Sequence, residues 1–269
     1  MMNFTTYAIL LCYMVAAVSG HIVFWHKRAT WLKPMLLALW SGLGLQLLML
    51  AVDVWRYGHV WGSASFNFVF MLVGIWTAAA LFIHVRTRNS LMALFAGPIA
   101  LLCLAAVSLF PKQPTYEQVQ TLQGVWLNLH IHLTLAAYAL LGLGFIHTVA
   151  YLGLAYMLQH KKLLAQRSGL SLESLNLWVN RLTWAGLAVL SFGLFAGWVW
   201  AVQEWAGPWV SDIKVLGAVV AWLAYVMVLS MRLRGRLHGK QGMWCLVACF
   251  VLLMAGLLLN RFIPNAYHV

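Results

Sequence analysis

Histidine, tryptophan and a few charged side chains in an otherwise apolar chain are the residues that could do chemistry. His130 lies in the stretch WLNLHIHLTLAAYALL, near one end of a long apolar run. Thr134 and Tyr138 follow it at four and eight residues, so the three share one helix face. His132 lies two residues on and points away, so the two histidines cannot easily ligate the same ion. A histidine within a membrane span is by default a functional candidate.

A second group of candidates lies in the turn GWVWAVQEWAGPWVSDIK, between two apolar stretches. Two interpretations are open. The tryptophans could form an aromatic belt, because the indole ring is apolar and its N–H is polar. Alternatively they form a flat apolar shelf for a flat apolar ligand, with the two charged residues fixing its edge. The residues concerned are Trp205, Trp209, Asp212 and Lys214.

Membrane-spanning helices must position these residues. The chain of 269 residues is 64% hydrophobic and 8% charged, whereas a soluble domain carries about a quarter charged residues. We expect an all-α, polytopic membrane helical bundle with about eight transmembrane helices, forming a single membrane domain over 1–269. Each span needs about twenty apolar residues. The expected spans are 4–25, 35–55, 66–85, 91–110, 126–158, 182–203, 214–231 and 243–263.

Basic residues are distributed unevenly between the loops. Loops one, three, five and seven hold 13 of the 17 Lys and Arg residues. The positive-inside rule then puts these loops in the cytoplasm and both termini on the outer, periplasmic side. The net charge of +12 is therefore a topology signal, and no nucleic-acid partner is expected. His130, His268 and the turn at 205–214 all come to the outer side.

Two histidines facing each other across a tryptophan-lined groove would suit an iron porphyrin. Imidazole nitrogen is a normal axial ligand of haem iron, and a basic side chain such as Lys214 could pair with the propionates. The alternative is that His130, as a lone interfacial histidine, only hydrogen-bonds to water or backbone. Pattern alone favours that alternative by about three to one.

Three further histidines lie toward the predicted cytoplasmic ends of spans: His21, His84 and His147. They could form an inner site, but separate interfacial residues are the favoured interpretation. Ser171 with Glu173 is typical of a helix start and predicts a short cytoplasmic or interfacial helix before the sixth span. The chain shows no P-loop, dinucleotide fingerprint or serine nucleophile elbow.

The turn also carries a family resemblance. Trp205, Trp209, Asp212 and Lys214 match the spacing of the signature Trp-Gly-x-x-Trp-x-Trp-Asp-Pro-Lys-Glu, in which Ser211 here replaces a tryptophan. The chain thus resembles the cytochrome c assembly proteins of the CcsA/CcmC/CcmF kind, which handle haem. Within them it is most similar to the smaller YpjD/HemX-like branch.

The resemblance implies a site on the outer face. His130, in WLNLHIHLTLAAYA, falls at the family's outer haem-ligand position. The partner histidine belongs to a C-terminal Gly-Leu-His-Ser-Tyr; here the tail reads Asn-Ala-Tyr-His, and His268 is the candidate. Gln46 stands where some relatives have a further membrane histidine.

The expected function is therefore a handling protein, rather than a catalyst, that presents or transfers haem b at the outer face of a bacterial inner membrane. His130 and His268 would ligate the iron. Trp205 and Trp209 would pack on the porphyrin, and Asp212 and Lys214 would orient the turn or the propionates. Expected partners are the lipid bilayer and other cytochrome c assembly proteins or an apocytochrome. The alternatives are a haem-free membrane scaffold or regulator, and a small-molecule transporter.

Overall fold

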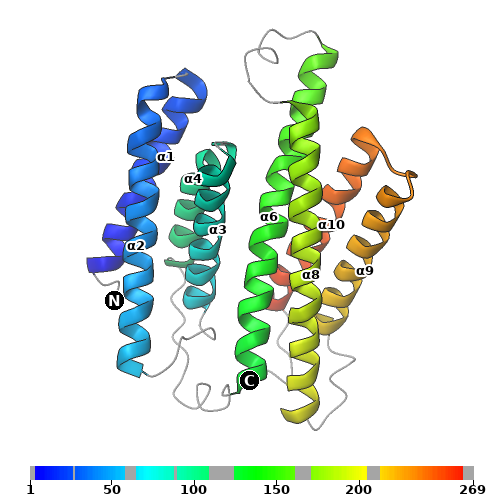
Figure 1. Cartoon of the computed structure of the whole chain (residues 1–269). Helices are drawn as coiled ribbons and strands as arrows, with labels where there is room; N and C mark the ends of the chain where they lie inside the picture. The colour runs from blue at the N-terminus through cyan, green and yellow to red at the C-terminus, as the bar shows by residue number, and fades with distance from the viewer. Residues whose placement is uncertain are drawn as a thin grey trace. The chain divides into compact units, whose positions relative to one another are not determined.

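The protein is a multi-pass membrane protein built from long apolar helices. The computed structural model describes residues 4–26, 28–57, 65–87, 90–108, 124–160, 171–204 and 213–262. Its described helices are α1 (Phe4–His26), η1 (Ala29–Trp31), α2 (Leu32–Tyr57), α3 (Ser65–Thr87), α4 (Leu91–Ser108), α6 (Val125–Gln159), α8 (Leu172–Glu204), α9 (Ile213–Leu233) and α10 (Gly239–Phe262) (Figure 1).

Eight α-helices coincide with the eight expected spans, and the all-α bundle is confirmed. Seven of them are long and apolar enough to cross a membrane, and α4 carries a shorter apolar segment, Leu91–Ala105. One expectation is wrong. The helix that starts at Ser171 is not a separate short one, because α8 runs without a break from Leu172 to Glu204. The predicted helix start is nevertheless correct: the backbone N–H of Ser174 donates to Ser171 Oγ at 3.0 Å, which caps α8 itself. The outer placement of both termini stays a prediction.

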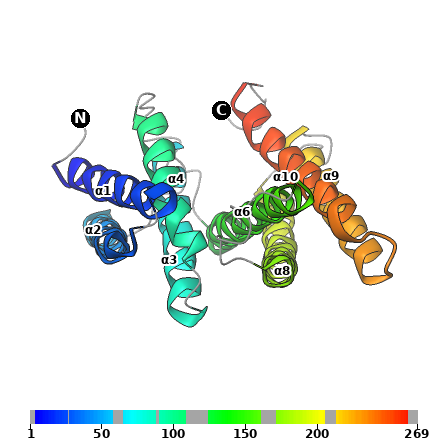
Figure 2. The same cartoon turned by 90° about the horizontal axis from the view of Figure 1, so that it is seen from above.

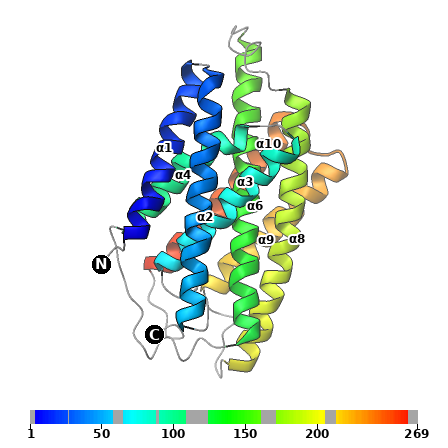
Figure 3. The same cartoon turned by 60° about the vertical axis from the view of Figure 1, so that its left-hand side comes forward.

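The chain divides into two compact units, 1–123 and 124–269. In the first, α1 packs against α2 and α4, and α3 packs against α4 and α2; Figure 3 shows α1 and α2 side by side. In the second, α6 packs against both α8 and α10, as Figure 2 shows from above, and α9 packs against α10. The single membrane domain expected over 1–269 stays a prediction.

A buried polar link joins three helices of the first unit. The Tyr13 hydroxyl of α1 donates to Gln46 Oε1 of α2 at 2.7 Å. The amide nitrogen of Gln46 donates in turn to the backbone carbonyl of Phe70 in α3 at 2.6 Å. Tyr13 and Gln46 are fully buried, so the link satisfies groups that would be costly to leave unpaired in an apolar interior.

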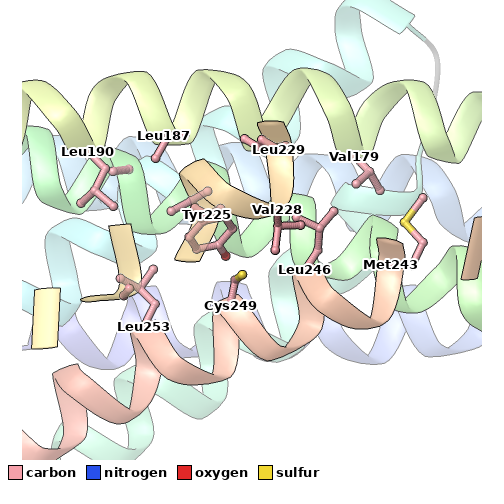
Figure 4. Close-up of a cluster of buried hydrophobic side chains, with 13 residues drawn as sticks. Val179, Leu187, Leu190, Tyr225, Val228, Leu229, Met243, Leu246, Cys249 and Leu253 are labelled. Carbon is pink, nitrogen blue, oxygen red and sulfur yellow. The ribbon is translucent and has the colours of Figure 1, made fainter. Parts of the chain in front are cut away.

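The second unit has its own apolar core. Figure 4 shows side chains from α8, α9 and α10 converging, among them Leu187, Tyr225 and Leu246. The bond from Trp222 Nε1 to Ser191 Oγ, at 2.8 Å, adds a polar tie between α9 and α8. These contacts fix α8, which carries one side of the site described below.

Close helix approach in the first unit gives a test of the packing. A Cβ at Gly97 of α4 would lie 2.8 Å from the backbone nitrogen of Ala17 and 2.9 Å from the carbonyl carbon of Ala16 in α1. Gly97→Ala must push the two helices apart and should destabilise the protein by about 1–3 kcal/mol. Thermal unfolding in detergent, followed by fluorescence-detected size exclusion, measures the effect.

Gly44→Ala is the matched control. A Cβ at Gly44 of α2 meets nothing within 4 Å, so the substitution should be neutral or gain the roughly 1 kcal/mol of helix propensity. Equal stability of the two variants would contradict the close approach of α4 to α1.

Candidate functional site

His130 lies in the second turn of α6, and its ring crosses to the neighbouring helix. Its Nδ1 lies 2.8 Å from the backbone carbonyl oxygen of Gly193 in α8. A carbonyl oxygen can only accept, so Nδ1 carries the proton and donates. Nε2 then holds the free lone pair of the neutral ring, and it has no hydrogen-bond partner among the described residues. A metal-ligating histidine commonly has this arrangement, one nitrogen donating to a carbonyl and the other left to bind.

The helices can approach this closely because α8 has glycines opposite the ring. A Cβ at Gly197 would lie 2.5 Å from His130 Nδ1 and 2.8 Å from its Cε1. A Cβ at Gly193 would lie 3.0 Å from Cγ2 of Thr134, one turn along α6. The spacing of four between these glycines is the small-residue pattern that lets membrane helices pack backbone to backbone.

The contacts between α6 and α8 continue along both helices in antiparallel register. Farther along α6, Leu141 packs against Gly186, and Gly144 lies against the Thr183 hydroxyl. Rising numbers on α6 thus meet falling numbers on α8, and Figure 1 shows the two helices side by side. The position of the His130 ring therefore depends on a long shared interface.

Aromatic side chains lie on the same two helices within one or two turns of His130. Trp126 of α6 makes an edge-to-face contact with Phe195 of α8, with centroids 6.4 Å apart. Phe195 in turn lies 5.9 Å from the Trp198 ring. All three remain at least a third exposed. They form an apolar, aromatic surface beside the ligand candidate.

His132 makes no such contact with α8. Its Nδ1 bonds to the carbonyl of Asn128 in its own helix at 2.6 Å. The sequence prediction that His130 and His132 point apart is therefore confirmed. Thr134, on the His130 face, donates its hydroxyl to the His130 carbonyl at 2.6 Å.

The other predicted site residues lie outside the described residues. This holds for Trp205, Trp209, Asp212 and His268, and for the side chain of Lys214, whose backbone belongs to the first turn of α9. Their assignment to a common site with His130 stays a prediction.

The three inner histidines each have neighbours of their own. His84 Nδ1 lies 3.3 Å from Ser90 Oγ, and His21 lies beside Trp25 with centroids 6.2 Å apart; both belong to the first unit. His147, in the second unit, is fully buried and bonds to the Leu143 carbonyl at 3.0 Å. In the described part of the chain, no group of three or more His, Cys, Asp or Glu side chains could hold a metal ion.

Sequence reasoning missed the α8 side of the site. Gly193, Gly197 and the aromatic pair Trp126 and Phe195 were not identified, although a Gly-x-x-x-Gly pattern in an apolar helix is a signal for close helix packing. Pairing that pattern with His130 requires the register between α6 and α8, which the sequence alone does not provide.

The comparisons with known proteins agree with this architecture. The family described as "Cytochrome C assembly protein" matches residues 30–268. The chain is 26% identical over 233 residues to the cytochrome c biogenesis protein CcsA of Prochlorococcus marinus (strain MIT 9303), covering 73% of each chain. It is 27% identical to the CcsA of Chlorella vulgaris, covering 77% of this chain and 75% of the relative. No solved structure matches.

The geometry around His130 predicts the effect of a single methyl group. Gly197→Ala places a Cβ against the His130 ring, which must swing away and lose its bond to Gly193. We expect a loss of about 1–3 kcal/mol in unfolding free energy from overpacking and the lost hydrogen bond. Gly153→Ala on α6 is the control, because its Cβ meets nothing within 4 Å. A Gly197→Ala protein as stable as Gly153→Ala would show that the ring does not lie against α8.

Proposed function

The chain belongs to the cytochrome c assembly protein family and has a role in cytochrome c biogenesis, and from this premise we propose that it binds haem b at the outer face of the membrane and presents it to other assembly proteins or to an apocytochrome. His130 would hold the haem iron through Nε2. The single observation that carries the proposal is the bond from His130 Nδ1 to the Gly193 carbonyl. It leaves the liganding nitrogen unprotonated and holds the ring against α8.

The described residues around His130 fit such a group. Bound haem would supply the porphyrin-held iron that is handed on. Gly193 and Gly197 hold the imidazole, and Trp126, Phe195 and Trp198 offer apolar surface for a porphyrin edge. Aromatic faces are well suited to flat apolar ligands.

The remaining site residues are assigned by the resemblance. His268 is the second ligand, Trp205 and Trp209 pack on the porphyrin, and Asp212 with Lys214 orients the turn or the propionates. A bis-histidine site of this kind would leave no open iron position for catalysis. A bacterial inner membrane is the proposed location.

A haem-free scaffold is the second candidate, and Gln46 favours it. Both ends of the Gln46 amide are occupied, by Tyr13 and by the Phe70 carbonyl. At a position where some relatives carry a membrane histidine, this residue joins helices instead. Under the scaffold hypothesis, the outer site has likewise lost its capacity to bind haem.

The pair His130 and His132 gives the direct test of the main proposal. His130→Ala removes the ligand and should lower haem per chain about tenfold or more, measured by pyridine haemochrome assay on detergent-purified protein. His132→Ala, two residues away on another face, should leave haem content unchanged. Equal haem in both variants would remove His130 from the site, and absence of haem from the parent protein would favour the scaffold.

His268→Ala tests the second ligand. If His268 binds iron, its loss should convert a low-spin spectrum into a high-spin one, because one strong-field imidazole is missing. Absorption and electron paramagnetic resonance spectra report the spin state. An unchanged low-spin spectrum would assign the second ligand to another residue.

A further inference from the structure

A cavity at the opposite end of the second unit is lined by cationic and amide groups. It has a volume of about 350 Å³ and lies where α9 ends, where α10 begins and where α8 has its first turns. Its polar lining consists of Arg232, Asn176, Asn180, His238 and the backbone of Gly239. By the distribution of basic loops, this end faces the cytoplasm.

Arg232 has more donors than its neighbours can satisfy. Its Nη2 donates to Asn176 Oδ1 at 2.9 Å and to Asn180 Oδ1 at 3.0 Å. Nη1 reaches only the Met243 sulfur, at 3.9 Å, and the buried Nε has no partner among the described residues. A guanidinium has five N–H donors, so two amide oxygens leave most of its hydrogen-bonding capacity and all of its charge uncompensated.

No carboxylate balances this charge within the cavity. The described lining contains no Asp or Glu. Glu173 precedes Asn176 by three residues on α8 but is exposed and does not line the cavity. A charge is costly to desolvate. A partly buried arginine that is held by two neutral amides, without an anion, is therefore unusual.

The start of α10 adds positive potential to the same place. Gly235, with φ of +68°, closes the C-terminus of α9: the N–H of Arg236 donates to the Met231 carbonyl at 2.9 Å. This turn folds the chain back so that Gly239, the first residue of α10, lines the cavity beside Arg232. The first N–H groups of a helix are unpaired within it and carry partial positive charge.

Part of the cavity wall is apolar. Trp184 and Leu233 line it and are 40% and 72% exposed. A ligand with an anionic head and an apolar part would satisfy both surfaces. Phosphate oxygens would accept from the guanidinium and from the start of α10, which are the two usual partners of phosphate in proteins.

We propose that this cavity binds a phosphate-bearing anion at the cytoplasmic membrane surface, with Arg232 as the main contact and Asn176 and Asn180 as its positioning residues. Two sources share this chemistry, a phospholipid headgroup and a soluble phosphate. The exposed Trp184 and Leu233 favour the lipid. The site is separate from His130, which packs against Gly193 and Gly197 near the other end of α8.

The test uses the full chain, purified in detergent and delipidated, with three variants. Arg232→Gln removes the charge. Asn176→Asp keeps the side-chain shape but places a carboxylate against the guanidinium, so the fold keeps its contact while the cavity loses its net charge. Arg234→Gln is the control, because Arg234 is exposed and does not line the cavity.

Native mass spectrometry measures binding of phosphatidylglycerol and of diacylglycerol, which has the same acyl chains without phosphate. Titration calorimetry measures inorganic phosphate. Arg232→Gln and Asn176→Asp should weaken phosphatidylglycerol binding about tenfold or more, the ordinary worth of a hydrogen bond to a charged group. Arg234→Gln should change it less than about twofold.

The outcomes separate the sources. Arg232-dependent binding of phosphatidylglycerol without inorganic phosphate binding supports a lipid site, and Arg232-dependent binding of inorganic phosphate supports a soluble ligand. The proposal is overturned if neither phosphate-bearing probe binds. It is also overturned if both cavity variants bind like the parent, or if diacylglycerol binds as tightly as phosphatidylglycerol.

Discussion

The close packing of α6 against α8 is the constraint on which the rest of the candidate site depends. Lipid tails are as apolar as leucine side chains, so two membrane helices gain little from hydrophobic association and rely on tight contact and hydrogen bonds. Glycines at 186, 193 and 197 allow that contact. Only at this separation can the His130 ring reach the carbonyl of Gly193, and that bond decides which ring nitrogen is left to bind.

Hydrogen bonds also hold other polar side chains of the apolar interior. Gln46 uses both ends of its amide to join α1, α2 and α3, and Thr183 donates back to the Val179 carbonyl of its own helix at 2.6 Å. Such side chains have partners that balance their capacity, and their role is structural. His130 and Arg232 keep an acceptor or donor that no described residue satisfies, and so does His147, whose buried Nε2 has no partner. His130 and Arg232 differ from His147 in what lies beside that group, which is a surface of exposed aromatic rings at His130 and a polar cavity at Arg232.

Apolar run length predicted the helices well. Each expected span has its helix, because about twenty apolar residues have few other stable forms in a bilayer. The short helix expected before the sixth span is instead the start of α8. Asn176 and Asn180 bind Arg232 of α9, so the helix continues through them. The sequence of one segment does not show that its polar residues have hydrogen-bond partners on another helix.

The site was only partly predictable. His130 stood out by residue type and by the resemblance, and its divergence from His132 followed from helical periodicity. Its contacts with Gly193 and Gly197 depend on the register between α6 and α8, because His130 and Gly193 are 63 residues apart in sequence. The cavity at Arg232 depends on the turn at Gly235, which brings α10 back beside α9. Both features are tertiary, and no local pattern encodes them.

The most direct measurement of the central claim is the reduced-minus-oxidised absorption spectrum of the detergent-purified parent protein. We expect a Soret band and the sharp α and β bands of a six-coordinate, bis-histidine haem b, at about one haem per chain. Protein produced with haem in excess that shows no such bands would contradict it, and the His130 ring would then be a packing element of the α6–α8 interface.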